Sequence, residues 1–263
     1  MKVMVTGTRG IPNILGGVET HCEELFPRIA RKSIDVTLIR RKSYVHDSLE
    51  EYKGVKLVDL EKKSFEAIIH TFKAILKAKS LHADVVHIHA IGPALLTPFA
   101  RLLGMKVVFT HHGPDYDRNK WGFAAKTMLR FWERMGCMFA NEVIVISEVI
   151  NDILVRKYGR KDCHLIYNGV PTPDKIDSTD YLSEIGVEPC KYVFAMGRFV
   201  PEKNFHQLIR AFAALKQQNY KLVLAGDTDF EDDYSKKLKS LAKENGVILT
   251  GFIKGTKLHE LLT

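Results

Sequence analysis

Histidines at the ends of two apolar runs are the residues of this chain whose type and spacing best suit chemistry. His87 and His89 alternate along one run, and His111-His112-Gly113 closes the next. Imidazole exchanges a proton near neutral pH more readily than any other side chain. The alternative is a buried histidine whose only role is a structural hydrogen bond. The pattern favours this alternative more for His87 than for the loop residue His112. No helical histidine pair or supporting acid completes a metal set, so we predict no metal site.

A glycine-rich segment, residues 7–20, follows the first apolar run and could hold a phosphate. It contains the adjacent Gly16 and Gly17, after which a helical pattern begins. Backbone N–H groups at such a helix start can approach a phosphate closely, and the helix dipole favours negative charge there. A flexible turn without a ligand is the alternative.

Two common nucleotide motifs do not fit this segment. A Walker loop requires Gly-Lys-Ser/Thr, which is missing, and the NAD pattern requires an acid after the second strand. Arg40 and Arg41 stand at that place instead. Only an NADP-like use of these arginines remains.

A pair of cations in the second half of the chain could bind a diphosphate. Gly197-Arg198 closes an apolar run, and Lys203 follows in the same loop. Arginine binds phosphate oxygens with its planar fork and lysine binds them as a point charge, so together they could neutralise a departing nucleotide. Two solvated surface cations are the alternative.

Acidic residues after the next apolar run invite a Mg²⁺ hypothesis. Acids at a helix start are also ordinary caps, and we favour capping. The residues are Asp227, Asp229, Asp232 and Asp233.

A basic stripe marks the helical pattern from Ala124 to Phe139. Lys126, Arg130 and Arg134 recur every fourth residue beside bulky apolar residues. Such a stripe can lie on an anionic membrane surface. Core packing with a solvated charged edge is the commoner explanation of the pattern.

The elements that must position these residues alternate between strand and helix. This order predicts an α/β fold of two Rossmann-like, doubly wound parallel-sheet domains. We expect strands at 2–6, 36–39, 85–89, 107–110, 143–146, 192–196, 222–225 and 247–250, and helices at 65–79, 94–103, 124–139, 149–158, 205–217 and 232–245.

A turn-rich stretch divides the two predicted domains. We expect an N-terminal domain at 1–168, a linker at 169–180 and a C-terminal domain at 181–263. The last segment is short for a doubly wound domain, so we expect that domain to be incomplete.

Bulk composition narrows the class of protein. The 263 residues are 46% apolar and 27% charged, as in a globular protein, and the net charge of +8 favours anionic partners. The four cysteines form no CxxC pair, and no signal peptide or membrane span is visible, so we expect a cytoplasmic protein. Nucleic-acid-binding motifs are missing, so we predict no nucleic-acid partner.

An ordered set of these motifs resembles the retaining glycosyltransferase family four, of the GT-B fold. The resemblance covers nearly the whole chain, and its N-terminal part is similar to the bacterial branch described as rhamnosyltransferase-like. The motifs are Gly16-Gly17-Val18-Glu19-Thr20, His111-His112-Gly113, Val145-Ile146-Ser147, Tyr167-Asn168-Gly169-Val170, and Gly197-Arg198 with Glu202-Lys203.

The resemblance implies a role for each matching residue. Gly16 and Gly17, with Gly197, would meet the donor phosphates, and His112 would sit beside the transferred sugar. Arg198 and Lys203 would neutralise the leaving diphosphate in place of a metal, so no cofactor is expected. On the acceptor side, the resemblance points to Glu19, Asp115 and Arg118.

The implied activity is transfer, with retention, of a hexose or deoxyhexose from a nucleotide-diphosphate sugar. The acceptor would be a glycan or lipid-linked saccharide in bacterial cell-surface polysaccharide or glycoconjugate synthesis. The protein could then be peripheral on the inner face of the plasma membrane, through the stripe of Lys126, Arg130 and Arg134. The family's paired donor-binding glutamates would lie beyond Thr263, so the chain alone should be weak or inactive.

Two alternatives stay open. A non-hydrolysing sugar-nucleotide epimerase shares the fold but needs no acceptor. A catalytically inactive module that binds an anionic membrane or nucleic acid would use the same positive charge.

Overall fold

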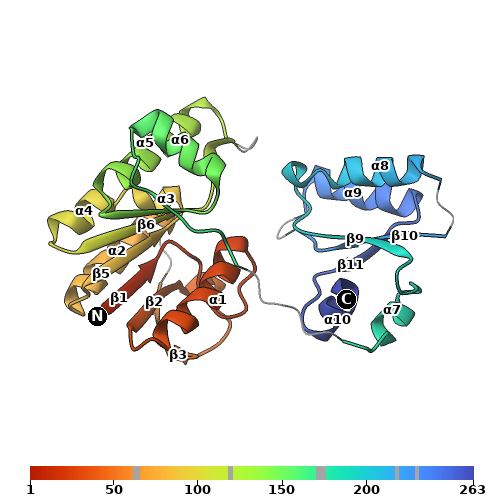
Figure 1. Cartoon of the computed structure of the whole chain (residues 1–263), viewed down its shortest axis with the longest axis horizontal. Coiled ribbons are helices and arrows are strands. Elements are labelled where there is room, and N and C mark those ends of the chain that lie inside the picture. Colours follow the sequence, from red (N-terminus) through yellow and green to blue (C-terminus); the bar gives the residue numbers. More distant parts are fainter. Residues whose placement is uncertain (62–65, 118–120, 170–175, 217–218, 229–230) are drawn as a thin grey trace. The chain divides into compact units, whose positions relative to one another are not determined.

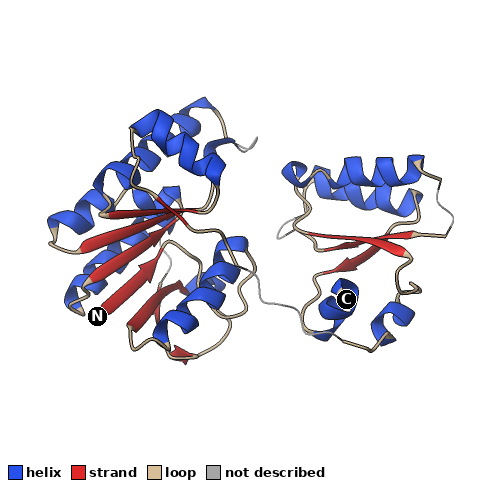
Figure 2. Ribbon diagram, viewed as in Figure 1, coloured by secondary structure: helices blue, strands red, loops and turns tan. Residues whose placement is uncertain are grey.

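A computed structural model shows the chain as two compact units, Met1–Val170 and Pro171–Thr263 (Figure 1). It describes residues 1–61, 66–117, 121–169, 176–216, 219–228 and 231–263. Each unit has its own parallel sheet, so each is described by itself (Figure 2).

Unit 1 is built on an eight-stranded sheet in the order β3-β4-β2-β1-β5-β6-β7-β8. The pairs are parallel except β3 with β4, which confirms the predicted parallel α/β fold. The strands are β1 (Lys2–Thr6), β2 (Asp35–Arg41), β3 (Glu51–Tyr52), β4 (Val55–Leu60), β5 (Val85–His89), β6 (Lys106–His111), β7 (Glu142–Val145) and β8 (His164–Leu165).

Helices cover both faces of this sheet because neighbouring strand residues point to opposite faces. Met4 and Ile39 belong to the larger buried cluster with α2 to α6, whereas Val5 and Leu38 belong to a cluster with α1. The helices are α1 (Gly17–Ala30), α2 (Glu66–Ser80), α3 (Ile91–Ala94), α4 (Thr97–Leu102), α5 (Phe123–Phe139) and α6 (Glu148–Tyr158), with 3-10 turns η1 (Lys42–Tyr44) and η2 (Asp115–Asp117).

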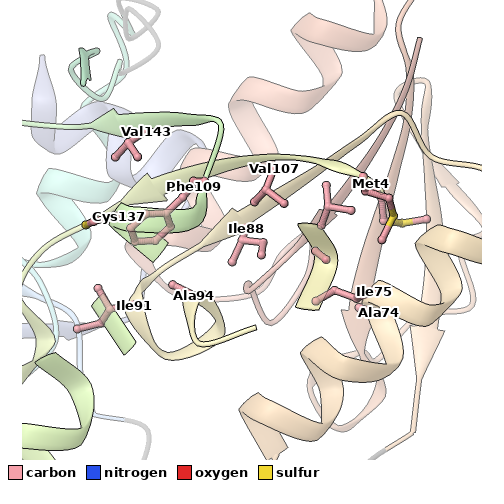
Figure 3. Packing of buried hydrophobic residues seen from close by; sticks show 14 of the residues in the cluster. Met4, Ala74, Ile75, Ile88, Ile91, Ala94, Val107, Phe109, Cys137 and Val143 are labelled. Atoms are coloured by element: carbon pink, nitrogen blue, oxygen red, sulfur yellow. The ribbon is translucent and has the colours of Figure 1, made fainter. Parts of the chain in front are cut away.

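The larger cluster packs Cys137 of α5 with Phe109 of β6 and with Ile91 and Ala94 of α3 (Figure 3). A Cβ added at Gly136 of α5 would lie 2.8 Å from Cβ of Ala94 and 2.9 Å from Cε1 of Phe109. Glycine therefore lets α5 pack tightly against α3 and β6, which places the buried face of α5 beneath the end of β6.

Several elements differ from the sequence expectation. Strands β3, β4 and β8 were not predicted, and the helix expected at 94–103 is divided into α3 and α4. Pro98 lies in the first turn of α4, where its missing N–H is tolerated, so a new helix begins there. The hairpin of β3 and β4 turns at Lys53-Gly54, both with positive φ. Phe65, where the second predicted helix begins, lies outside the described residues.

Unit 2 has a three-stranded parallel sheet in the order β11-β10-β9. Leu222 and Leu224 pack with α8 and α9, and Val223 packs on the other face with α7 and α10. The elements are α7 (Asp180–Glu184), β9 (Tyr192–Met196), η3 (Pro201–Lys203), α8 (Phe205–Ala214), β10 (Lys221–Ala225), α9 (Asp233–Glu244), β11 (Ile248–Gly251) and α10 (Thr256–Leu262).

The acidic residues after β10 were expected to cap a helix, and one of them caps α9. Asp232 is the N-cap of α9, where its Oδ1 accepts from Ser235 N at 2.8 Å and Ser235 Oγ accepts from Asp232 N. Asp227 pairs with Lys239 at 3.0 Å. Capping is thus confirmed for Asp232, while Asp229 and the predicted helix end at Gln217 lie outside the described residues.

None of the helices in the described ranges combines the length and apolarity that crossing a membrane requires.

Candidate functional site

The glycine loop after β1 is shaped by close contact with β5. A Cβ on Gly7, whose φ is +95°, would lie 2.1 Å from the carbonyl oxygen of His89. Only glycine combines this φ with that approach. The loop therefore leaves the sheet directly beside the carboxyl end of β5.

Glu19 holds the loop in place from the first turn of α1. Its buried carboxylate accepts from Thr8 Oγ1 at 3.2 Å and from Arg9 N at 3.0 Å. Gly16 lies against the same carboxylate, since an added Cβ would stand 1.9 Å from Glu19 Oε2, and its φ is +152°. Gly17 begins α1, is exposed, and would meet nothing within 4 Å of an added Cβ. The start of α1 is thus open to a ligand.

His112 lies beside this helix start, within a cluster of imidazoles. Its Nε2 is 2.8 Å from Nδ1 of His89, and its ring centroid lies 5.2 Å from that of His21 in α1. Among the described residues His112 makes no other hydrogen bond that the structure shows, which leaves Nδ1 able to contact a ligand. We call His21, His87, His89 and His112 the histidine cluster.

His87 is the structural member of the histidine cluster. Its Nε2 lies 2.7 Å from Thr110 Oγ1, and its ring stacks on that of His89 with centroids 4.3 Å apart. The ring of Phe26 in α1 packs nearly perpendicular to both rings, with centroids 5.6 Å from each. Packing from β5, β6 and α1 therefore fixes the ring of His89, which in turn holds His112.

The environment keeps the cluster uncharged. Burial, and then the neighbouring His21 and His111, lower the pKa of His112 to about 3. Burial also lowers the pKa of His87 to about 3 and that of His89 well below its ordinary value. His112 is therefore a neutral imidazole at pH 7, suited to hydrogen bonding rather than to donating a proton as an imidazolium.

A second buried network lies under His111. Glu133 of α5 is buried, and its Oε1 accepts from His111 Nε2 at 2.7 Å and from the Tyr116 hydroxyl at 3.1 Å, while Oε2 accepts from the Tyr158 hydroxyl at 2.5 Å. Gly113 N donates to His111 Nδ1 at 3.1 Å, which fixes the Nε2–H tautomer. This network ties α5 and α6 to the loop that carries His112.

Sequence reasoning missed His21, Glu133, Tyr116 and Tyr158. His21 follows Gly17 by one helical turn, which was a visible signal. The local sequence pattern does not indicate that a glutamate in the middle of α5 faces inward and contacts a histidine. Glu133 is one of several charged residues in a basic helix, so its residue type alone does not distinguish it.

The outward face of α5 combines basic and apolar side chains. Its inward face buries Leu129, Glu133, Gly136 and Cys137. On the other side, Arg130 and Arg134 are exposed. Large apolar side chains lie exposed on the same helix, with exposed fractions of 84% at Phe123, 48% at Met128, 52% at Phe131, 52% at Met138 and 43% at Phe139.

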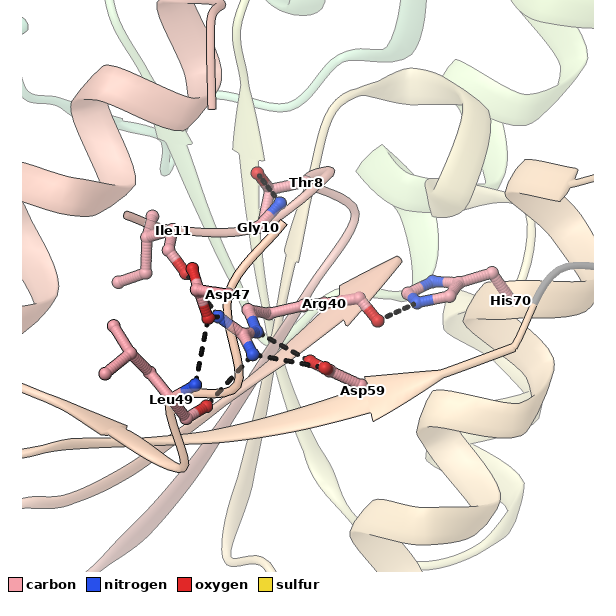
Figure 4. A network of polar contacts seen from close by, with 8 residues as sticks. All are labelled: Thr8, Gly10, Ile11, Arg40, Asp47, Leu49, Asp59 and His70. Atoms are coloured by element: carbon pink, nitrogen blue, oxygen red, sulfur yellow. Dashed lines mark hydrogen bonds and ion pairs between the residues drawn. The ribbon is translucent and has the colours of Figure 1, made fainter. Parts of the chain in front are cut away.

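Arg40 does not support the NADP-like use of the arginines after β2. The side chain is 1% exposed, and its guanidinium pairs with Asp59 at 2.6 Å and Asp47 at 2.8 Å and donates to the carbonyls of Ile11 and Leu49 (Figure 4). These partners occupy the fork that a 2′-phosphate would need, so Arg40 is a structural residue that braces the glycine loop.

Unit 2 places its predicted cations at the end of β9. A Cβ on Gly226 would lie 2.0 Å from the carbonyl oxygen of Gly197, so the two strand ends pack backbone to backbone. Lys203 Cδ would be 3.7 Å from a Cβ on Gly197, and the lysine is exposed. Arg198 is half-buried in the same loop. Gly197, Arg198 and Lys203 therefore do gather at one strand end.

The remaining predicted residues are placed differently. Asp115 lies in η2 and is half-buried, and Glu19 is engaged within the glycine loop rather than exposed to an acceptor. Lys126 in α5 is half-buried. Arg118 lies outside the described residues.

Comparison with known families explains this arrangement. The sequence profile of Glycosyltransferase Family 4 matches residues 15–173, and that of Glycosyl transferases group 1 matches residues 183–263. The fold is that of GT-B glycosyltransferases. The chain belongs to Glycosyltransferase Family 4.

Relatives with assigned names support this placement. An N-acetylgalactosamine-N,N'-diacetylbacillosaminyl-diphospho-undecaprenol 4-alpha-N-acetylgalactosaminyltransferase of Campylobacter jejuni is 33% identical over 251 residues, 90% of this chain and 66% of that protein. The alpha-monoglucosyldiacylglycerol synthase of Streptococcus pneumoniae is 27% identical over 197 residues, 69% of this chain and 45% of that protein.

The chain is shorter than its relatives. The glycosyltransferase YqgM of Bacillus subtilis, uncharacterised, is 28% identical over 188 residues, and the match spans 50% of its length. Among solved structures, HepE of Anabaena in complex with UDP and glucose superposes with a TM-score of 0.76 at 20% identity, covering 99% of this chain and 71% of that one. That likeness supports the fold.

Proposed function

We propose that this chain belongs to an enzyme that transfers a hexose or deoxyhexose, with retention, from a nucleotide-diphosphate sugar. The acceptor is a glycan or a lipid-linked saccharide of bacterial cell-surface polysaccharide or glycoconjugate synthesis. The observation that carries the proposal is a neutral His112 held by His89 beside the open helix start at Gly17.

In this proposal the glycine loop and His112 act on the donor. N–H groups at the start of α1 face a phosphate, and Gly17 permits close approach. His112 uses Nδ1 to hydrogen-bond the transferred sugar. Because its imidazole stays neutral at pH 7, it adds no positive charge that would repel the oxocarbenium-like sugar of the transition state.

Arg198 and Lys203 supply the positive charge that the leaving diphosphate needs. The guanidinium donates paired hydrogen bonds and the ammonium acts as a point charge, so negative charge that grows on the leaving oxygen is neutralised. With this pair the reaction needs no bound metal. Gly197 and Gly226 keep the loop's backbone close to the strand end.

The acceptor proposal takes support from two relatives. The Campylobacter enzyme's name specifies a diphospho-undecaprenol substrate and an alpha linkage, and the Streptococcus enzyme's name specifies an alpha-glucosyl diacylglycerol product. An alpha product made from an α-linked nucleotide sugar is retention. Both names describe lipid-linked molecules, which suits the exposed basic and apolar face of α5 and a peripheral place on the inner face of the plasma membrane.

A donor and acceptor screen tests the proposal. The protein is titrated with UDP, GDP and dTDP sugars by calorimetry and then assayed with lipid-linked saccharides. We expect one nucleotide family to bind and an alpha-linked product by NMR. His112→Asn should lower kcat at least about tenfold with little change in fold, as expected for a group that acts mainly in the transition state.

The outcomes separate the alternatives. Interconversion of the donor without an acceptor would favour the epimerase. Failure to bind any nucleotide sugar would refute the transferase proposal. The inactive binding module would then be the remaining hypothesis.

A further inference from the structure

Three histidines from separate elements converge at one end of the unit 1 sheet. His21 comes from α1, His89 ends β5, and His112 follows β6. One ring nitrogen from each lies within 4.8 Å of the other two. The ring centroids are 5.2 to 5.9 Å apart in the three pairs.

The surrounding fold holds these rings in fixed positions. The ring of His89 stacks with those of His87 and His112, and the ring of Phe26 packs nearly perpendicular to it. Preformed positions reduce the ordering cost of binding an ion. His21 and His112 are only partly buried, so an ion can reach the cluster from solvent.

One nitrogen of His89 is left without a role. Its Nε2 is buried and, among the described residues, has no hydrogen-bond partner. Buried ring nitrogens are nearly always paired, so this Nε2 is an unused position that can take up the ring's proton when Nδ1 of His89 binds a metal.

We propose that His21, His89 and His112 bind one transition-metal cation such as Zn²⁺. Neutral imidazole is the nitrogen ligand that this ion prefers, with bonds of about 2.0–2.1 Å that set tetrahedral N···N distances near 3.4 Å. The 2.8 Å pair of His89 and His112 must open and His21 must move inward to reach that spacing. These are side-chain adjustments within a preformed cluster.

Metal binding requires one proton of the cluster to change its position. In the metal-free protein a single N–H joins the nitrogens of His89 and His112. Coordination by both of these nitrogens breaks that N–H bond, moves its proton to the other nitrogen of the same ring and forms two metal–nitrogen bonds, so both imidazoles stay neutral and no proton is released. His21 supplies the third bond, and water or an anion completes the shell.

A bound metal would regulate the site already described. It would take the Nε2 of His112 away from His89 and draw the ring from the donor, so Zn²⁺ should inhibit sugar transfer. This inhibition rests on the proposed function, whereas metal binding does not. The prediction of no metal site from sequence was made without His21, which only the fold brings to the other two.

The test measures the metal directly. The whole chain is titrated with Zn²⁺ by calorimetry and with Co²⁺ by visible absorption, whose intensity reports four-coordinate geometry. We expect one ion per chain, with affinity lowered at least about tenfold in His21→Asn and His112→Asn, as for the loss of a ligand. His164→Asn, which changes an exposed histidine paired with Glu142, is the matched control and should bind as the unaltered chain does.

A free thiol could give a false signal, so Cys190→Ser is included because Cys190 is exposed. Binding that survives Cys190→Ser and is lost in His21→Asn supports the site. Binding that is equal in His21→Asn and in the unaltered chain, or no binding at all, overturns it. Binding without inhibition of transfer would support the metal site and contradict the catalytic role proposed for His112.

Discussion

His111 and His112 are neighbours in the chain with opposite surroundings. His111 points into the core, where Glu133 and Gly113 fix both of its ring nitrogens. His112 points to the loop side and is fixed at one nitrogen only. The buried neighbour thus sets the backbone of the loop, and the half-buried one remains able to contact a ligand.

Glu133→Gln tests the electrostatic part of this network. Burial alone would raise the pKa of Glu133, but hydrogen bonds from His111 and Tyr158 outweigh it and hold the pKa below its ordinary value. The ionised carboxylate therefore stabilises the fold fully above pH about 4.3 and less as the pH falls through the lowered pKa. We expect the variant to lose about 1–3 kcal/mol at pH 7, by urea unfolding, and to lose less at pH 3.

Glu142→Gln is the matched control, because Glu142 makes an exposed pair with His164. An exposed pair contributes about 0–1 kcal/mol, so this variant should stay close to the unaltered chain. If Glu133→Gln lost as much unfolding free energy at pH 3 as at pH 7, the shape of the Glu133 side chain and not its charge would cause the loss.

Local pattern located some site residues and not others. Gly16, Gly17, His112 and Arg198 lie in the segments that follow apolar runs, and in parallel sheets such loops meet at the carboxyl edge. His21 and Glu133 join the same region through helix packing. Their contacts, Glu133 with His111 at a separation of 22 residues and His21 with His112 far along the chain, depend on which helix face turns inward. Local composition does not carry that information.

Helix α5 shows how one element can serve two environments. Its inward face holds Glu133 and Cys137 in the core, and its outward face exposes Phe131 and Met138 beside Arg130 and Arg134. Exposed aromatic and sulfur-containing side chains flanked by arginines suit the interface of an anionic membrane. Core packing thus describes the inward face, and contact of the outward face with an anionic membrane stays a prediction.

Reversal of two charges on α5 tests membrane contact. In co-sedimentation with vesicles that contain anionic lipid, Arg130→Glu with Arg134→Glu should remove most of the bound protein at low salt, since each basic residue near the surface contributes about 1 kcal/mol. Binding of the unaltered chain should weaken as salt rises.

Lys236→Glu with Lys237→Glu on α9 is the matched control, with the same change in net charge on an exposed helix of unit 2. Equal losses in the two double variants would show that net charge, and not the α5 surface, governs binding.

At the scale of elements, long periodic segments were predictable and short pairings were not. Helix α5 and strand β5 begin and end within a residue of the prediction. Strand β3 has two residues, and β3 and β4 are held together by the Lys53-Gly54 turn, a local geometry that apolar periodicity does not report. Pro98 marked the break between α3 and α4, but its effect on that helix was overlooked.

The whole chain has separate buried cores for its two units. Within the described residues, two hydrophobic clusters draw only on unit 1, and the other two draw only on unit 2. Each sheet also depends on its own tight glycine contact, Gly7 against His89 in unit 1 and Gly226 against Gly197 in unit 2. Domains with cores of their own can unfold in separate steps.

Alanine at these two glycines should therefore affect different parts of the unfolding curve. The added Cβ would lie about 2 Å from a backbone carbonyl in each case, and both glycines have positive φ, so each variant should lose more than about 2 kcal/mol in its own unit. By calorimetry, Gly7→Ala should lower one transition and Gly226→Ala the other. Gly92→Ala, with nothing within 4 Å of the new Cβ, should leave both in place. If either alanine lowered the whole curve as a single transition, the two cores would have to be treated as one cooperative unit.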